Sequence, residues 1–300
     1  MVKYKKSAGG ITFDIALYAF MVLMAAAFLF PFWSTLVLAF TTSEQSLIPG
    51  LRLWPTPISL ESFRLVFAYQ YIWTGYLNTI FRAVVGASLC VFFTMLTAYS
   101  ISKKTLPLRG VMTFIILFTM FFNGGLVPGY ILMRNLGIMN TPWALILPLL
   151  TSAWYVFIAR NFIMALPESL EEAAVMDGAN PLRILVRIIF PLSMPIISVI
   201  GLWSLVQHWN SWFDALLYIN TKAKMPLQAI VRNLIDPTDI TGANVTLMEI
   251  SGMGTSEYAR FTTETLIAAS IMVSIGPIIV VYPFLQKYFV KGILVGSLKG

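Results

Sequence analysis

Residues 169–191 read SLEEAAVMDGANPLRILVRIIFP and form a polar interruption between two strongly apolar stretches of the sequence. Ser169 and Glu172 have the spacing of a capping box, in which a hydroxyl and a carboxylate satisfy exposed backbone N–H groups at a helix start. Gly178 follows, and glycine readily takes the left-handed conformation that ends a helix. The stretch therefore predicts a short helix that begins at Ser169 and ends at Gly178.

A second short helix is predicted directly after the first. Asn180 and Pro181 form an N-cap and first-turn pair. Pro191 and Pro195 lack the backbone N–H that a helix interior uses, so they mark where this helix gives way to the next apolar stretch. If only these helix start and stop signals are considered, the two short helices are also compatible with an ordinary loop between membrane helices.

The composition places the chain in a lipid bilayer. Of its 300 residues, 58% are hydrophobic and only 11% are charged, with a mean hydropathy of +0.80. A soluble domain carries about 25% charged residues. The net charge of +7 does not indicate nucleic-acid binding, because the basic residues are scattered singly between apolar stretches. Cys90 is the single cysteine, which excludes an intrachain disulfide, and we expect it to be a small core residue.

The apolar stretches predict an all-α polytopic membrane protein with six transmembrane helices. A bilayer-spanning helix needs about 20 mainly apolar residues. The six stretches that meet this requirement are residues 14–39, 77–101, 111–134, 142–164, 192–217 and 266–287.

Basic residues in the short loops predict the orientation, since Lys and Arg are enriched in cytoplasmic loops. With six spans, four segments lie on one side and hold twelve of the twenty basic residues. Both termini and the 165–191 loop are therefore predicted to be cytoplasmic. Arg82, one turn inside the second span, is predicted to extend toward the outer headgroups. The twelve residues are Lys3, Lys5, Lys6, Lys103, Lys104, Arg109, Arg160, Arg183, Arg187, Lys287, Lys291 and Lys299.

The third span is predicted to be broken near its middle. Asn123, Gly124, Gly125 and Pro128 all disfavour a continuous helix there. Non-helical backbone at that depth is tolerated only where it is buried in protein or lines an aqueous cavity. Asn123 is therefore a candidate pathway residue, with a simple packing kink as the alternative.

The fifth span carries a second candidate for the substrate pathway. Trp203, Gln207, Asn210 and Asp214 fall at i, i+4, i+7 and i+11, which places them on one face of a continuous helix. Polar groups in hydrocarbon are costly, so this face, which offers amides, a carboxylate and an aromatic ring, is predicted to point inward. The alternative is that Asp214 and Asn210 lie at the outer interface and Trp203 only packs between helices.

No catalytic machinery is evident in the sequence. The phosphate-binding pattern G-x-x-x-x-G-K-[S/T] does not occur, so the chain does not hold ATP in that manner. The one histidine, His208, has no acidic or cysteine cluster near it in sequence, and we interpret it, with Trp209 and Trp212, as a packing or interfacial-belt residue. The chain is therefore not predicted to be an enzyme or to bind a metal.

The central stretch resembles the EAA motif, E-A-A-x3-G-x9-I-x-L-P, of ATP-binding-cassette (ABC) importer permeases. The matching positions are Glu172, Ala173, Ala174, Gly178, Ile188 and Pro191, and Phe190 replaces the usual Leu with another apolar residue. The sequence FNGGLVPGY at 122–130 resembles the matching helix of sugar-importer permeases, specifically an LplC-like group. The ending FVKGILVGSLKG resembles that of MalG-type permeases.

This resemblance implies a type I importer permease fold. It divides the chain into an N-terminal helix and outer loop (1–76), a permease core (77–289) with the EAA loop at 169–191, and a cytoplasmic tail (290–300). The tail is expected to reach between the ATPase subunits. The residues implied to couple the chain to an ATPase are Glu171, Glu172, Ala173, Ala174, Asp177, Gly178 and Pro191.

The resemblance also implies partners and cofactors. A second homologous permease subunit, two ABC ATPase subunits and an extracytoplasmic solute-binding protein are expected, with a sugar or oligosaccharide as substrate. ATP and Mg²⁺ are expected on the partner ATPase and no cofactor on this chain. Three alternatives are an ABC permease for another solute, an ATP-independent channel or carrier, and a membrane enzyme. The second is disfavoured because the spans offer no chain of carboxylates for relaying protons.

Overall fold

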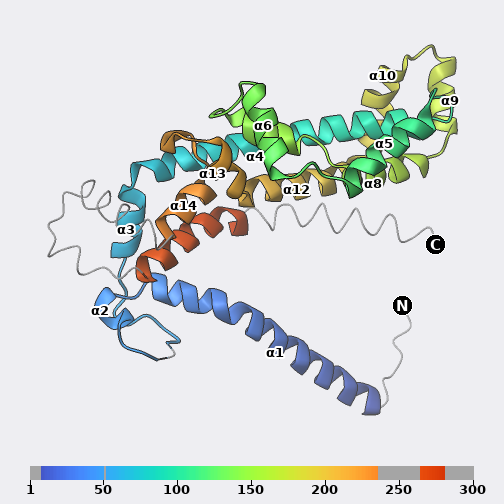
Figure 1. Cartoon of the computed structure of the whole chain (residues 1–300). Coiled ribbons are helices and arrows are strands. Elements are labelled where there is room, and N and C mark those ends of the chain that lie inside the picture. Colours follow the sequence, from blue (N-terminus) through green and yellow to red (C-terminus); the bar gives the residue numbers. More distant parts are fainter. Residues whose placement is uncertain (1–7, 51, 236–263, 281–300) are drawn as a thin grey trace. The chain divides into compact units, whose positions relative to one another are not determined.

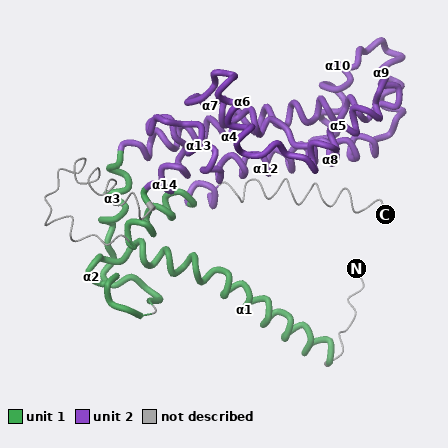
Figure 2. The backbone as a smooth tube through the Cα atoms, in the orientation of Figure 1, with its two compact units in different colours: residues 1–69, 234–275 green, residues 70–233, 276–300 purple. Residues whose placement is uncertain are grey.

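The computed structural model describes residues 8–50, 52–235 and 264–280, so the predictions about the tail at 290–300 fall outside the described residues. The described residues are helical throughout, apart from loops and one isolated antiparallel bridge between Thr41 and Ile58 (Figure 1). They belong to two compact units, residues 1–69 with 234–275 and residues 70–233 with 276–300 (Figure 2).

The first unit contains α1 (Ala8–Ala39), α2 (Ser43–Ser46) and α3 (Glu61–Ala68). Its first helix exposes apolar side chains on all sides along most of its length, as a helix does when lipid is its solvent. The loop after α1 folds back on its end: the Trp33 indole donates to the Leu53 carbonyl at 2.9 Å, and its ring lies 5.9 Å from that of Trp54. Phe40 and Phe63 make a second aromatic contact, with ring centroids 4.8 Å apart.

The second unit is built along α4 (Gln70–Ser102). Its 33 residues correspond to about 50 Å of helix, longer than the roughly 30 Å hydrocarbon core of a bilayer. The helix packs along α12 (Met194–Asn210) and α8 (Ala153–Met164). The shared core contains Met95, Ala98, Tyr99, Ile101, Val156, Ala159, Ile163, Ala174, Ile184, Leu185, Ile189 and Ile200.

Shorter elements complete this unit. They are α5 (Arg109–Phe121), α6 (Leu126–Asn135), α7 (Pro142–Ile146), α9 (Ser169–Met176), α10 (Pro181–Ile184), α11 (Phe190–Leu192), α13 (Phe213–Tyr218) and α14 (Leu227–Ile235), whose last two residues belong to the first unit. Helices α9 and α10 lie at one end of the unit and α13 lies toward the other (Figure 1).

Two of the predicted spans are bent or broken, and a third bend lies where the central loop joins the fifth span. Helices α5 and α6 form an angle of 116°, and the break falls at the predicted Asn123–Gly125 segment, where Gly125 has a φ of +87°. The segment from Pro142 to Leu149 meets α8 at 50°, and the segment from Pro181 to Leu192 meets α12 at 83°. The expected break in the third span is thus confirmed, and the fourth predicted span, 142–164, is two helices with a bend between them.

By length and composition, residues 9–39 and α4 can each cross a membrane, and counting each bent pair as one span brings the number to five. A further apolar helix occupies Glu264–Val280, inside the sixth predicted stretch for most of its length. The helical membrane-protein class is confirmed, and the number of six spans stays a prediction.

Candidate functional site

The polar interruption folds into α9 and a left-handed turn, as the sequence predicts. Gly178 has a φ of +75°, and its N–H donates to the Val175 carbonyl at 2.9 Å. The next N–H, of Ala179, reaches back to the Ala174 carbonyl, also at 2.9 Å. These two bonds define a Schellman motif, which ends a helix and turns the chain sharply. Gly178 is therefore the bend between the two short helices.

The predicted capping box is absent. Ser169 is the first helical residue and not the cap, and the N-cap position belongs to Glu168, which makes no side-chain hydrogen bond to the helix start. Instead, the Glu168 carboxylate accepts a hydrogen bond from Lys104 at 2.9 Å. This bond and the charge of the lysine lower the pKa of Glu168. The Glu168 side chain thus pairs with a residue distant in sequence, which residue spacing within the loop does not reveal.

The second helix begins as predicted. The Asn180 side chain accepts a hydrogen bond from the Arg183 N–H at 2.8 Å, with Pro181 in the first turn. The helix then widens into a π-helical segment, Leu185–Ile189, before Pro191. A proline cannot donate to the carbonyl four residues earlier, and its ring crowds that carbonyl, so a local widening relieves the conflict.

The predicted coupling residues divide between an inner and an outer face. Ala174 is buried in the core shared with α4 and α8, and Glu171 is half-buried against Lys103. Glu172, Ala173 and Asp177 are exposed. The remaining two, Gly178 and Pro191, are exposed at the bend and at the end of the π-helical segment. Two apolar side chains in the same stretch are also exposed, Met176 at 87% and Leu182 at 61%. This end of the unit offers a mixed apolar and acidic surface.

Three of the four predicted pathway residues share one face of α12. Trp203, Gln207 and Asn210 are all exposed. The Tyr155 ring on α8 stacks near Trp203, with centroids 5.9 Å apart, and its hydroxyl lies 3.5 Å from the Gln207 amide oxygen. Tyr155 is an addition that the sequence pattern missed, because only the packing of α8 on α12 brings it there.

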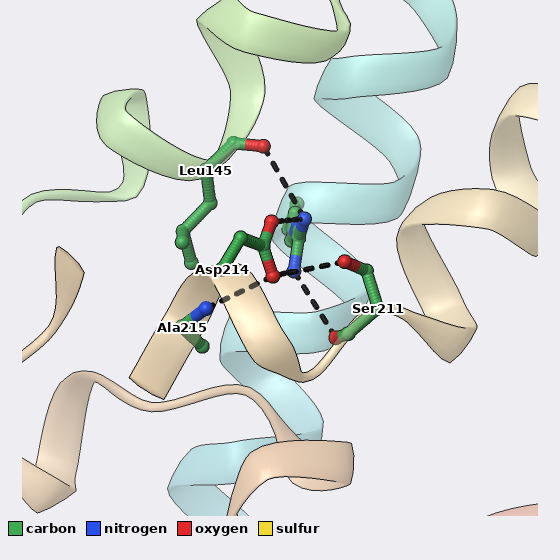
Figure 3. Close-up of polar contacts among 5 residues, drawn as sticks. Leu145, Ser211, Asp214 and Ala215 are labelled. Carbon is green, nitrogen blue, oxygen red and sulfur yellow. Dashed lines mark hydrogen bonds and ion pairs between the residues drawn. The ribbon is translucent and has the colours of Figure 1, made fainter. Parts of the chain in front are cut away.

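Asp214 does not continue this face. Helix α12 ends at Asn210, Ser211 is extended, and Asp214 lies in α13. Its carboxylate accepts hydrogen bonds from the Ser211 hydroxyl at 2.8 Å and from the Ala215 N–H at 2.9 Å (Figure 3). The continuous helix assumed for residues 203–214 was therefore wrong, because local side-chain bonds begin a new helix.

Arg82 is the principal partner of Asp214. Its guanidinium is 1% exposed and forms an ion pair with the carboxylate. It also donates to the carbonyls of Ser211 at 3.2 Å and Leu145 at 3.3 Å (Figure 3). The prediction that Arg82 extends toward headgroups was wrong, since a partly buried counter-charge and two carbonyls hold its terminal nitrogens inside the unit, while its Nε has no hydrogen-bond partner.

The interpretation of His208 as a packing residue is confirmed. It is 1% exposed and packs against α4 at Gly86, where an added Cβ would lie 2.7 Å from two ring carbons of the histidine. Trp209 is also buried, whereas Trp212 is 37% exposed, with Arg232 5.4 Å from the centre of its ring. Cys90 is buried, as expected. Within the described residues, no group of three His, Cys, Asp or Glu could hold a metal ion.

Asn123 lies at the break between α5 and α6. Its side chain is exposed, and its amide oxygen accepts a hydrogen bond from the Gly125 N–H at 2.8 Å. The residue therefore stabilises the turn locally. No residue of α5 is buried in the chain, so the surface of this helix is available to lipid or to a partner.

No family model matches the chain. It is 36% identical over 289 residues to the polygalacturonan/rhamnogalacturonan transport system permease protein YtcP of Bacillus subtilis, an alignment that covers 96% of this chain and 98% of that protein. It is 34% identical over 291 residues to the protein LplC of the same organism, covering 97% and 96%. Among solved structures, it resembles a bacterial ABC transporter involved in the import of the acidic polysaccharide alginate. That match has a TM-score of 0.83 and 30% identity, covering 96% of this chain and 100% of that one.

The helical architecture and these relatives define a membrane permease. More narrowly, the chain belongs to the family of carbohydrate ABC importer permeases, as the EAA motif and the LplC-like FNGGLVPGY segment indicated.

Proposed function

We propose that this chain forms half of a translocation pore and is driven through the loop that contains α9. In the proposed complex, a second homologous permease completes the pore, two ABC ATPase subunits bind ATP and Mg²⁺, and an extracytoplasmic binding protein delivers an oligosaccharide. Both termini and the α9 loop face the cytoplasm. The observation that carries the proposal is α9 itself, a helix that ends at the Gly178 turn and exposes Glu172, Ala173 and Met176.

The geometry of α9 supports docking on a soluble partner. Ala173 is small and lets a partner backbone approach closely, while the exposed thioether of Met176 can adapt to an apolar pocket. Ala174, on the inner face, packs with α4 and α8. A partner that moves α9 therefore also moves the core of the unit, which is the kind of rigid-body coupling that alternating access needs.

The proposed pathway follows the exposed face of α12. Trp203 and Tyr155 offer stacked aromatic surfaces, and Gln207 and Asn210 offer amide hydrogen bonds. Sugar rings present both an apolar face and hydroxyl groups, so this combination matches their chemistry. Asn123 is a secondary candidate, since its exposed turn could line the same pore in a complete complex.

The substrate is proposed to be an acidic oligosaccharide. In residues 122–164 and 192–235, Asp214 is the only acidic residue, and it is paired with Arg82. On the side proposed to be external, these segments expose Arg134, Lys222 and Lys224. Exposed positive charges attract anionic ligands and raise their local concentration. The outer segment 40–76 also exposes Glu44 and Glu61, so the positive charge is confined to the segments named here. The names of the relatives YtcP and the alginate importer support the same substrate class.

Purification of the tagged chain from its native membrane tests the proposal. An ABC ATPase and a second permease should co-purify, and reconstituted vesicles should import oligogalacturonate in an ATP-dependent way. A carboxyl-reduced oligosaccharide of the same length is the matched neutral control. Import without ATP would indicate a carrier, and preferential import of the neutral sugar would reject the acidic substrate while leaving the importer intact.

A further inference from the structure

Two ion pairs join α9 to the end of α4. Lys103 and Lys104 directly follow the last residue of α4, and they reach residues of the central loop more than 60 positions later in the sequence. Lys103 pairs with Glu171, and Lys104 pairs with Glu168 at 2.9 Å. Both lysines belong to the basic residues that the sequence analysis assigns to the cytoplasmic side. Counting charges in this way does not predict which acidic residue each lysine contacts.

The two pairs differ in environment. The side chains of Lys104 and Glu168 are 74% and 73% exposed, whereas those of Lys103 and Glu171 are 30% and 24% exposed. Exposed ion pairs contribute little, since water screens them and two long side chains must be ordered. Lys103 is already ordered, because its ammonium lies 4.3 Å from the centre of the Tyr99 ring, one helical turn earlier. The Lys103–Glu171 pair is therefore the stronger attachment.

This pair determines which face of α9 points outward. Glu171 and Ala174 are three residues apart and lie on the same side of the helix. One is held by Lys103 and the other is buried with α4 and α8. Two attachments on one side fix the rotation of α9 about its axis. Glu172, Ala173 and Met176 are consequently kept on the exposed side.

A groove between α9 and the end of α4 gives the pair a mechanical role. The groove has a volume of about 800 Å³ and is lined by residues 102–105, by Ile163 and Leu166, and by the α9 residues Glu171, Glu172, Val175 and Met176, so it opens onto the exposed side of the helix. Helix α9 is therefore not packed continuously on the body of the unit, and the ion pairs bridge the space. Without the Lys103–Glu171 bridge, α9 could tilt into the groove.

We propose that Lys103 is a positioning residue of the coupling loop, which ties α9 to α4 through Glu171 so that movement of α9 passes directly to the helix that packs along α12. The inference rests on the proposed function of α9. Along the chain, α9 is joined to the rest of the unit only through α8 before it and α10 after it. The Lys103–Glu171 pair adds a direct connection from α9 to α4. Loss of the connection should uncouple ATP hydrolysis from import more than it weakens binding of the ATPase.

A double-mutant cycle in the complete reconstituted importer tests this role. The variants are Lys103→Met, which keeps most of the stem and removes the charge, Glu171→Gln, and the two combined. Each single variant should raise the ATP hydrolysed per sugar imported about fivefold, because a shielded charge-assisted bond is lost. The double variant should be no worse than either single one. The matched control, Lys104→Met with Glu168→Gln, should change that ratio less than twofold, since the pair is exposed.

The charge-swapped variant Lys103→Glu/Glu171→Lys decides the outcome. Restoration of at least half of the coupling, or of ATPase binding if the single variants lose it, supports the inference. No restoration, equal effects of the Lys104 pair, or unchanged coupling in Lys103→Met would each overturn it. Gly178→Val, measured in parallel, separates the two proposals: if that variant also imports normally, the role of the loop fails and not only the role of Lys103.

Discussion

Arg82 of α4, which is buried, and Asp214 of α13, which is partly buried, form an ion pair across 132 residues of sequence. The guanidinium also donates to the Leu145 carbonyl near the end of α7 and to the Ser211 carbonyl at the chain reversal after α12. One side chain of α4 thus joins α7, the turn after α12 and α13. The chain turns after α12 ends at Asn210, and α13 then places the Asp214 carboxylate against Arg82.

Breaking this pair should destabilise the protein severely. Asp214→Ala leaves the buried Arg82 charge without a counter-charge, at a cost of about 3–5 kcal/mol. The midpoint temperature of thermal unfolding in detergent should be much lower for Asp214→Ala than for the unchanged protein. The double variant Arg82→Met/Asp214→Leu removes both charges and should recover most of the stability. A double variant as unstable as Asp214→Ala would mean that the backbone carbonyls, not the charge balance, dominate.

Gly86 should tolerate no side chain while His208 is present. An added Cβ would lie 2.7 Å from two carbons of the imidazole, so Gly86→Ala should cost about 1–3 kcal/mol through overpacking. His208→Ala in the same chain should relieve the clash. Gly201→Ala is the matched control, because its Cβ would meet Val91 at an ordinary 3.5 Å. The unfolding midpoints of all three variants are measured in detergent. If Gly201→Ala is as unstable as Gly86→Ala, the close contact between Gly86 and His208 is not the cause.

Gly178→Val should reduce import while the protein still inserts in the membrane. No atom lies within 4 Å of the Cβ position, so the substitution acts only through the left-handed backbone, at about 1–2 kcal/mol. Gly178→Asn is the control, since Asn tolerates this conformation better. Glu172→Lys should reduce import by reversing the charge of the proposed docking surface. Wild-type import by Gly178→Val and Glu172→Lys together would exclude this loop as the coupling element.

Alanine at Gln207 or Asn210 should lower import about fivefold each, since one sugar hydrogen bond is worth about 1 kcal/mol. Stimulation of ATP hydrolysis by the binding protein should persist, because α9 is untouched. Ser198→Ala on the same helix is the control, as its hydroxyl bonds to the Met194 carbonyl of its own helix. Loss of assembly in the two amide variants would instead identify this face as a seam between subunits, and Asn123 would become the leading pathway candidate.

Cysteine labelling should place α9 and the 222–224 segment on opposite sides of the membrane. In a Cys90→Ser background, Lys222→Cys should react with an impermeant reagent in intact cells, and Lys104→Cys only after permeabilisation. Both positions are exposed, so failure to react reflects the membrane and not burial. Reaction of Lys104→Cys in intact cells would reverse the proposed orientation.

The sequence alone determined the features that depend on local backbone chemistry. The helix end at Gly178, the cap at Asn180 and the break near Gly125 each follow from what one residue can do with its own backbone, and all three are present. Apolar length likewise predicted the membrane-helical class, because a bilayer demands about 20 apolar residues wherever a helix crosses it.

Only the tertiary structure decided the electrostatic partners. Arg82, Lys103 and Lys104 were interpreted from their position relative to the membrane, yet their counter-charges lie 64 to 132 residues away in sequence. The same limitation applies to Asp214, which periodicity assigned to the face of α12. Side-chain spacing predicts contacts only within one continuous helix, whereas a buried charge takes whatever partner the packing of other helices brings to it.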